Sequence, residues 1–84
     1  MTHAFYSDAA EKARVELTRG ERAAVEAVRV SLETDPGQGR PTPDSDLRVV
    51  ELLPEETGGR GISVVFRYNE ELDALLISWL VAGP

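Results

Sequence analysis

The spacing of apolar residues changes once along the chain, near residue 46. Before that point apolar residues recur every three or four positions, and after it they alternate with polar ones. The first spacing puts side chains on one face of a helix, and the second puts them on one face of a strand. The clearest helical stripe consists of Ala24, Val25, Val28 and Leu32. The pattern therefore predicts an α+β fold in which the helices precede a sheet.

Two capping signals predict where the helices begin. Asp8 with Glu11 resembles a capping box, and it predicts a short helix over residues 9–17. Thr18 with Glu21 is a better capping box, and it begins the longer helix. Proline and glycine in Asp35-Pro36-Gly37 end that helix. These signals predict a helical hairpin with almost no spacer.

The strands are predicted from alternation and from the breakers between them. His3-Ala4-Phe5-Tyr6 is a short N-terminal strand. A loop rich in proline and glycine, residues 35–46, is long for a compact domain and is expected to cover something or to be mobile. Three antiparallel strands follow, at residues 47–53, 62–68 and 72–81. The stretch 54–61, with its three glycines, is expected to be a hairpin loop.

The last strand is apolar on both faces. Strict alternation puts Ala74, Leu76 and Leu80 on one face, and Leu75, Ile77, Trp79 and Val81 on the other. Two short helices are expected to cover only one face of the sheet, so the second set of four is a candidate interface. Two interpretations of Trp79 remain open, an interface anchor and a core residue covered by the long loop.

Composition limits the function. Eighty-four residues make one domain, residues 1–84. The absence of cysteine and the single His3 argue against a transition-metal site, and no cofactor is expected. No signal peptide or membrane span is predicted, so the expected location is the cytoplasm. A net charge of −6 argues against direct nucleic-acid binding.

The order of elements resembles the RelE/ParE toxin superfamily of bacterial toxin–antitoxin modules. The residues that carry this resemblance are Asp8-Ala9-Ala10, Leu32-Glu33-Thr34-Asp35-Pro36, Gly39-Arg40-Pro41, Leu47-Arg48-Val49, Val65-Phe66-Arg67-Tyr68 and Leu76-Ile77-Ser78-Trp79. The resemblance implies a toxin that acts on translation, as an mRNA endonuclease, or on DNA gyrase, and that is neutralised by an antitoxin protein.

The nuclease residues that the resemblance implies are incomplete. Ser63 aligns with the arginine that RelE-type nucleases carry on the strand before the last. The sequence stops at Gly83-Pro84, before the C-terminal tyrosine or basic residue of those nucleases, and their positive charge is missing. We therefore expect a protein that acts by binding other proteins, and not an enzyme.

Weak catalytic candidates are Arg67, Arg48 and Arg60, which with Arg40 are the arginines of the predicted loop and sheet. The simpler interpretation is that they pair with nearby acids: Asp44, Asp46, Glu51, Glu55 or Glu56. Glu70, Glu71 and Asp73 are expected to be turn residues and not a cation site. The hydroxyls of Tyr6 and Tyr68 are expected at the rim of the core.

The sequence leaves two functions open. The first is a toxin-like protein that binds an antitoxin and a target in translation or gyrase. The second is a non-catalytic interaction domain, or a homodimer, built on the same fold. The acidic charge favours binding over catalysis, and the order of elements favours the toxin.

Overall fold

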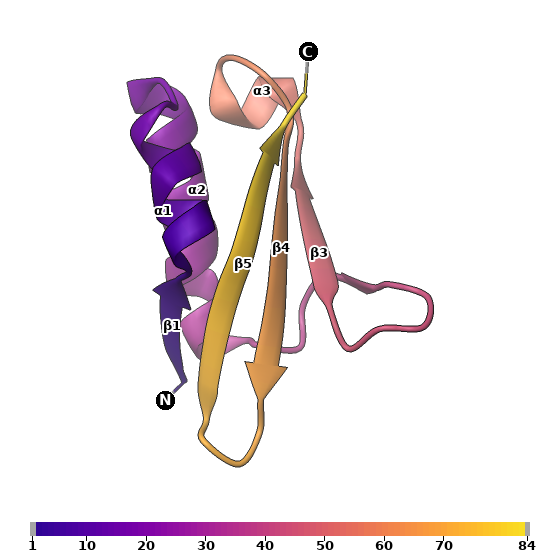
Figure 1. The fold of residues 1–84 in the computed structure, drawn as a ribbon. Helices are drawn as coiled ribbons and strands as arrows, with labels where there is room; N and C mark the ends of the chain where they lie inside the picture. Colours follow the sequence, from indigo (N-terminus) through magenta and orange to yellow (C-terminus); the bar gives the residue numbers. More distant parts are fainter. Residues whose placement is uncertain (1, 84) are drawn as a thin grey trace.

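The computed structural model describes residues 2–83 as helices packed on one side of a mixed sheet (Figure 1). The helices are α1 (Asp8–Val15), α2 (Arg19–Thr34) and α3 (Pro54–Thr57). The strands are β1 (His3–Tyr6), β2 (Arg40–Pro41), β3 (Arg48–Leu52), β4 (Ile62–Asn69) and β5 (Ala74–Ala82). The α+β class and the order of the main elements agree with the prediction.

The sheet has five strands in the order β1-β5-β4-β3-β2, and not the predicted three. Strands β3, β4 and β5 are antiparallel, as expected, whereas β1 pairs in parallel with β5 and places Phe5 beside Leu76. The prediction missed this pairing because strands about 70 residues apart leave no local pattern in the sequence. The N-terminal strand is thus an edge of the sheet.

The long loop contributes the short strand β2 to the edge of the sheet opposite β1. Within residues 35–46, the two residues of β2 pair with β3, with Arg40 beside Val49 and Pro41 beside Arg48. The loop does not cover Trp79, which is 50% exposed. The stretch 54–61 is also more ordered than predicted, because it begins with α3 and Gly58 ends that helix at φ 72°.

The two helix starts differ in how well they match the prediction. Thr18 and Glu21 form the predicted capping box of α2, and Asp35 ends that helix. The N-cap of α1 is Ser7 and not Asp8: its hydroxyl accepts a hydrogen bond from the Ala10 N–H at 3.0 Å. Serine is as good a cap as aspartate, so the local sequence did not separate the two positions.

The core lies between the helices and one face of the sheet. The largest fully buried apolar side chains are Phe66, Leu32, Ile62, Leu75, Ile77, Val25 and Val64. The predicted stripe of α2 meets Ile62, Val64 and Phe66 of β4 in this core. None of the helices described in residues 2–83 is long and apolar enough to cross a membrane.

Candidate functional site: the open face of the sheet

The face of the sheet opposite the helices carries exposed apolar side chains. Phe5 is 57% exposed, Leu76 44%, Trp79 50% and Val81 56%. Phe5 and Leu76 are register partners, and Trp79 pairs with the half-buried Val65 of β4. Trp79 is therefore a surface residue, and the interpretation of Trp79 as core is wrong.

A β-bulge decides which residues of β5 reach this face. Val65 pairs with Trp79 and Phe66 with Ile77, so Ser78 is an extra residue. An extra residue reverses the alternation beyond it. Leu75, Ile77 and Leu80 therefore point into the core, with exposures of 1%, 0% and 8%.

The predicted face assignment fails for this reason. Of the candidate interface residues, Trp79 and Val81 are exposed, whereas Leu75 and Ile77 are core residues. Leu76, which strict alternation placed on the opposite face, joins Trp79 on the open one. Phe5 was missed because its pairing with β5 was not foreseen.

Ser7, near the N-terminus, makes two hydrogen bonds to the bulged part of β5. Its N–H donates to the carbonyl of Ile77 at 2.8 Å, and its hydroxyl donates to the carbonyl of Ser78 at 2.7 Å. The same hydroxyl caps α1. Ser7 thus links the start of α1 to the β-bulge at Ser78 in β5.

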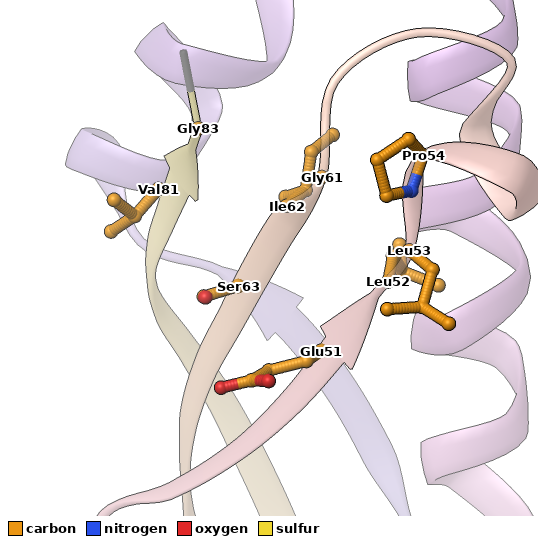
Figure 2. Close-up of a pocket in the computed structure, with 9 residues that line it drawn as sticks. All are labelled: Glu51, Leu52, Leu53, Pro54, Gly61, Ile62, Ser63, Val81 and Gly83. Carbon is orange, nitrogen blue, oxygen red and sulfur yellow. The ribbon is translucent and has the colours of Figure 1, made fainter.

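A shallow depression of about 330 Å³ lies at the end of this face where the chain leaves β5. Val81, Ser63, Glu51 and Leu53 are among its lining residues, and Figure 2 shows their side chains around it. Leu53 is 53% exposed. We call Phe5, Leu76, Trp79, Val81 and Leu53 the apolar stripe.

The three weak catalytic candidates lie in different places. Arg67 is on the open face beside Leu76, and its Nε donates to Asp46 at 3.1 Å. Arg48 lies on the strand position paired with buried Phe66 and donates to the carbonyls of Gln38 and Gly39. Arg60 follows α3. The fold therefore does not bring these arginines together as one anion site.

Arg60 is held by Glu21, a partner that the sequence did not suggest. Glu21 is buried and accepts hydrogen bonds from the Arg60 backbone N–H and guanidinium at 3.0 and 3.1 Å. These bonds, with one from the Thr18 N–H, lower the pKa of Glu21 to about 2. The capping glutamate of α2 thereby fixes the loop that follows α3.

Arg40, the remaining arginine of the predicted loop and sheet, also forms an ion pair. Arg40 donates to Glu51 at 2.6 Å, beside the depression. The expectation that these arginines pair with neighbouring acids is thus confirmed for Arg40 and Arg67. Ser63, which the resemblance aligns with the arginine of RelE-type nucleases, lies on the open face between Glu51 and Val81 on the neighbouring strands.

Both tyrosines donate to carboxylates. The Tyr6 hydroxyl donates to Glu26 at 2.9 Å, and burial together with that carboxylate raises the pKa of Tyr6. The Tyr68 hydroxyl donates to Asp73 at 2.9 Å, and this bond raises the pKa of Tyr68. Within residues 2–83 no group of three or more acidic or histidine side chains is placed to hold a metal ion.

Comparisons with known proteins give the fold. No protein-family model and no curated protein matches this sequence. Among solved structures, a chain of the intact E. coli RelBE toxin–antitoxin complex superposes with a TM-score of 0.83 at 13% identity. The superposition covers 100% of this chain and 99% of that chain. The chain therefore has a RelE-like fold, which the sequence resemblance predicted.

Proposed function

We propose that this protein is the toxin-like component of a toxin–antitoxin module, and that it acts by binding protein and not by cutting RNA. The observation that carries the proposal is the superposition over the full length on a chain of the RelBE complex. That complex joins a toxin to its antitoxin, so a protein partner of antitoxin type is proposed here as well. The target is in translation or is DNA gyrase.

The electrostatics support binding over nuclease action. A nuclease that stabilises a developing phosphate charge needs cationic groups aimed at one point. Here Arg67, Arg48 and Arg60 lie apart, and each donates hydrogen bonds within the protein. The aligned arginine position is Ser63, and the chain carries a net charge of −6. The open face presents apolar side chains instead.

The first experiment tests the toxin role. Induced expression in a bacterial host should slow growth, and co-expression of a small open reading frame adjacent to the gene should restore it. Pulse labelling of protein synthesis and plasmid supercoiling would separate a translation target from gyrase. Soluble, folded protein that leaves growth unchanged would favour the non-catalytic interaction domain instead.

The second experiment tests the absence of nuclease action. Purified protein added to a ribosome-containing translation reaction should leave the mRNA intact, while a RelE-type nuclease cleaves it in a parallel reaction. Codon-aligned cleavage that disappears in Arg67→Ala would contradict the proposal. Arg67 would then stabilise the charge that develops on the phosphate.

A further inference from the structure

We propose that Arg29 and Glu33 of α2 close the outer edge of β1, and that this closure keeps two copies of the chain from pairing edge to edge. The inference goes beyond the proposed function and does not depend on it. It rests on the backbone groups of β1 that face away from the sheet, on the side chains that bond them, and on the sequence of the strand.

The pairing of β1 with β5 defines which backbone groups lie on the outer edge. The His3 N–H donates to the carbonyl of Asp73. The Ser7 N–H donates in the same way to the carbonyl of Ile77. Backbone groups of successive residues in a strand point to opposite sides, so the N–H and C=O of Ala4 point away from β5. Outward groups of this kind, when unpaired, form a template for a further strand.

Both outward groups of Ala4 are bonded by side chains of α2. The Ala4 N–H donates to the Glu33 carboxylate at 3.2 Å, and the Arg29 guanidinium donates to the Ala4 carbonyl at 3.2 Å. Arg29 and Glu33 also form an ion pair at 3.3 Å. Next to β1, the Thr2 N–H donates to the backbone carbonyl of Glu33 at 3.2 Å. Side chains and the end of α2 therefore occupy the positions that a neighbouring strand would use.

Glu26 aims the guanidinium of Arg29 at this edge. The Arg29 Nε donates to both carboxylate oxygens of Glu26 at 3.0 Å, and Nη2 donates to one of them at 2.6 Å. Nη1 is left for Glu33 and for the β1 carbonyl. The spacing of three and four residues puts these three side chains on one face of α2. The side chains of Arg29 and Glu33 are only 22% and 23% exposed, so the pair is a fixed part of the surface.

The strand itself carries none of the usual protections of an edge. Its sequence, His3-Ala4-Phe5-Tyr6, has no proline, lysine or acidic residue. The opposite edge, β2, is two residues long, and one of them is Pro41, which has no backbone N–H. Within residues 2–83, β5 has no strand neighbour beyond Ile77 on the β1 side, but α1 packs against β5. Closure of the β1 edge therefore depends on α2.

An open β1 edge favours a second copy of this chain as its partner. Two strands related by a two-fold axis run antiparallel, and with Ala4 opposite Ala4 they exchange two N–H···O=C bonds. His3 of each copy then lies opposite Phe5 of the other. Both side chains are exposed, and within one chain their rings are 6.2 Å apart. Aromatic pairs across strands would stabilise the dimer.

The test variant is Arg29→Met/Glu33→Ala. It frees both outward groups of Ala4 and leaves the net charge at −6. Methionine and alanine are strong helix formers, so α2 should persist, and circular dichroism checks this.

The matched control is Glu11→Ala/Arg14→Met, which also removes an ion pair from a helix and also leaves the net charge at −6. Arg14 lies 5.1 Å over the ring of Tyr6, so this pair is close to β1 as well. Its hydrogen bonds within residues 2–83 are to Glu11 and not to the β1 backbone. The control thus separates closure of the edge from the mere presence of charge beside it.

Sedimentation from about 10 to about 300 µM compares the three proteins, because a dimer grows with concentration. Wild type and control should stay monomeric, and the test variant should become a dimer. Phe5→Ser added to the test variant should weaken that dimer about tenfold. Equal behaviour of wild type, control and test variant, whether as monomers or as dimers, would overturn the proposal.

Hydrogen exchange of the Ala4 amide reports the edge directly. In the dilute test variant it should be about tenfold or more faster than in wild type, and it should slow again where the dimer forms. Glu33→Ala alone, which keeps Arg29 bonded to Glu26, should show the same faster exchange. Glu33→Gln keeps an oxygen acceptor and should retain the protection.

An Ala4 amide that is already unprotected in wild type would overturn the proposal, as would a dimer of the test variant in which that amide stays unprotected. Equal exchange in Glu33→Ala and Glu33→Gln would show that the Glu33 oxygen does not close the edge. Growth and RNA cleavage play no part in these readouts, so failure here is distinguishable from failure of the proposed function.

Discussion

At the scale of single residues, Ser7 has more contacts than its position near the N-terminus suggests. Its hydroxyl accepts from the Ala10 N–H and donates to the Ser78 carbonyl, and its N–H donates to Ile77. The start of α1 and the bulge of β5 therefore depend on one side chain. Because the bulge brings Trp79 to the surface, Ser7 also affects the proposed binding face.

Ser7→Ala should destabilise the protein by about 1–2 kcal/mol, since it removes an N-cap and leaves the Ser78 carbonyl without that donor. Chemical denaturation measures the change. Ser63→Ala is the control, because no hydrogen bond of the Ser63 hydroxyl occurs within residues 2–83, and it should alter stability by less than about 0.5 kcal/mol. Equal stability of the two variants would show that the Ser7 contacts contribute nothing net.

Glu21 gives the stability a predictable dependence on pH. Its carboxyl pKa is lowered from 4.5 to about 2, first by the Arg60 side chain and then by the backbone N–H groups of Thr18 and Arg60. A lowered carboxyl pKa stabilises the fold above the unfolded-state pKa, and that contribution is lost as the pH falls through the folded-state pKa. The contribution of Glu21 should thus decline between about pH 4.5 and pH 2.

Denaturation midpoints measured across that range test this expectation. Glu21→Gln should be less stable than wild type at neutral pH, and the difference should shrink as the pH falls toward 2. A difference between the two proteins that stays constant over the range would mean that Glu21 is not the titrating group. Other carboxyls with lowered pKa values, such as Glu26 and Asp73, are present in both proteins and cancel in the comparison.

At the scale of elements, α2 is the helix whose start is best specified. The Thr18 hydroxyl accepts from the Glu21 N–H at 3.2 Å, and the Glu21 carboxylate accepts from the Thr18 N–H at 2.9 Å. Its inner stripe of Val25, Val28 and Leu32 is buried in the core. Local capping and the burial of one face therefore act together on this helix.

Thr18→Ala should lower the free energy of unfolding by about 0.5–2 kcal/mol, the usual cost of losing an N-cap. Thr18→Ser, which keeps the acceptor, should recover most of the loss. The measurement is again a denaturation midpoint with its slope. An unmoved midpoint at an unchanged slope in the alanine variant would show that the cap does not stabilise α2.

At the scale of the whole molecule, the fold leaves one face of the sheet without a covering layer. The helices pack on the face that carries Phe66, Leu75 and Ile77, and the apolar stripe lies on the other. The free energy of folding therefore depends little on Trp79, whereas binding is expected to depend on it strongly.

Trp79→Glu should remain folded and monomeric, with a loss of stability below about 1 kcal/mol, because the side chain is already half in water. Ile77→Glu, two positions earlier and fully buried, should fail to fold because it places an unpaired charge in the core. Sedimentation and circular dichroism of both variants make the comparison. Unfolding of Trp79→Glu would mean that Trp79 belongs to the core after all.

Local signals were enough to predict much of this protein. The capping box at Thr18, the stop at Asp35 and the strand at residues 62–68 depend on neighbours within a few residues, and the structure agrees with each. For Trp79 the sequence left core and interface open, and the structure places it half-exposed; Val81, a candidate interface residue, is exposed as well.

Contacts between residues far apart in the chain decided the rest. The pairing of β1 with β5, the hydrogen bond from Ser7 to Ser78 beside the bulge, and the bond between Arg60 and Glu21 join residues 39 or more positions apart. Such contacts produce no periodic pattern of apolar residues in the sequence. A single inserted residue in a strand nevertheless reverses which side chains face the core. The sequence by itself therefore determined the helices, the strands and their order, whereas the tertiary structure decided which apolar residues became core and which became surface.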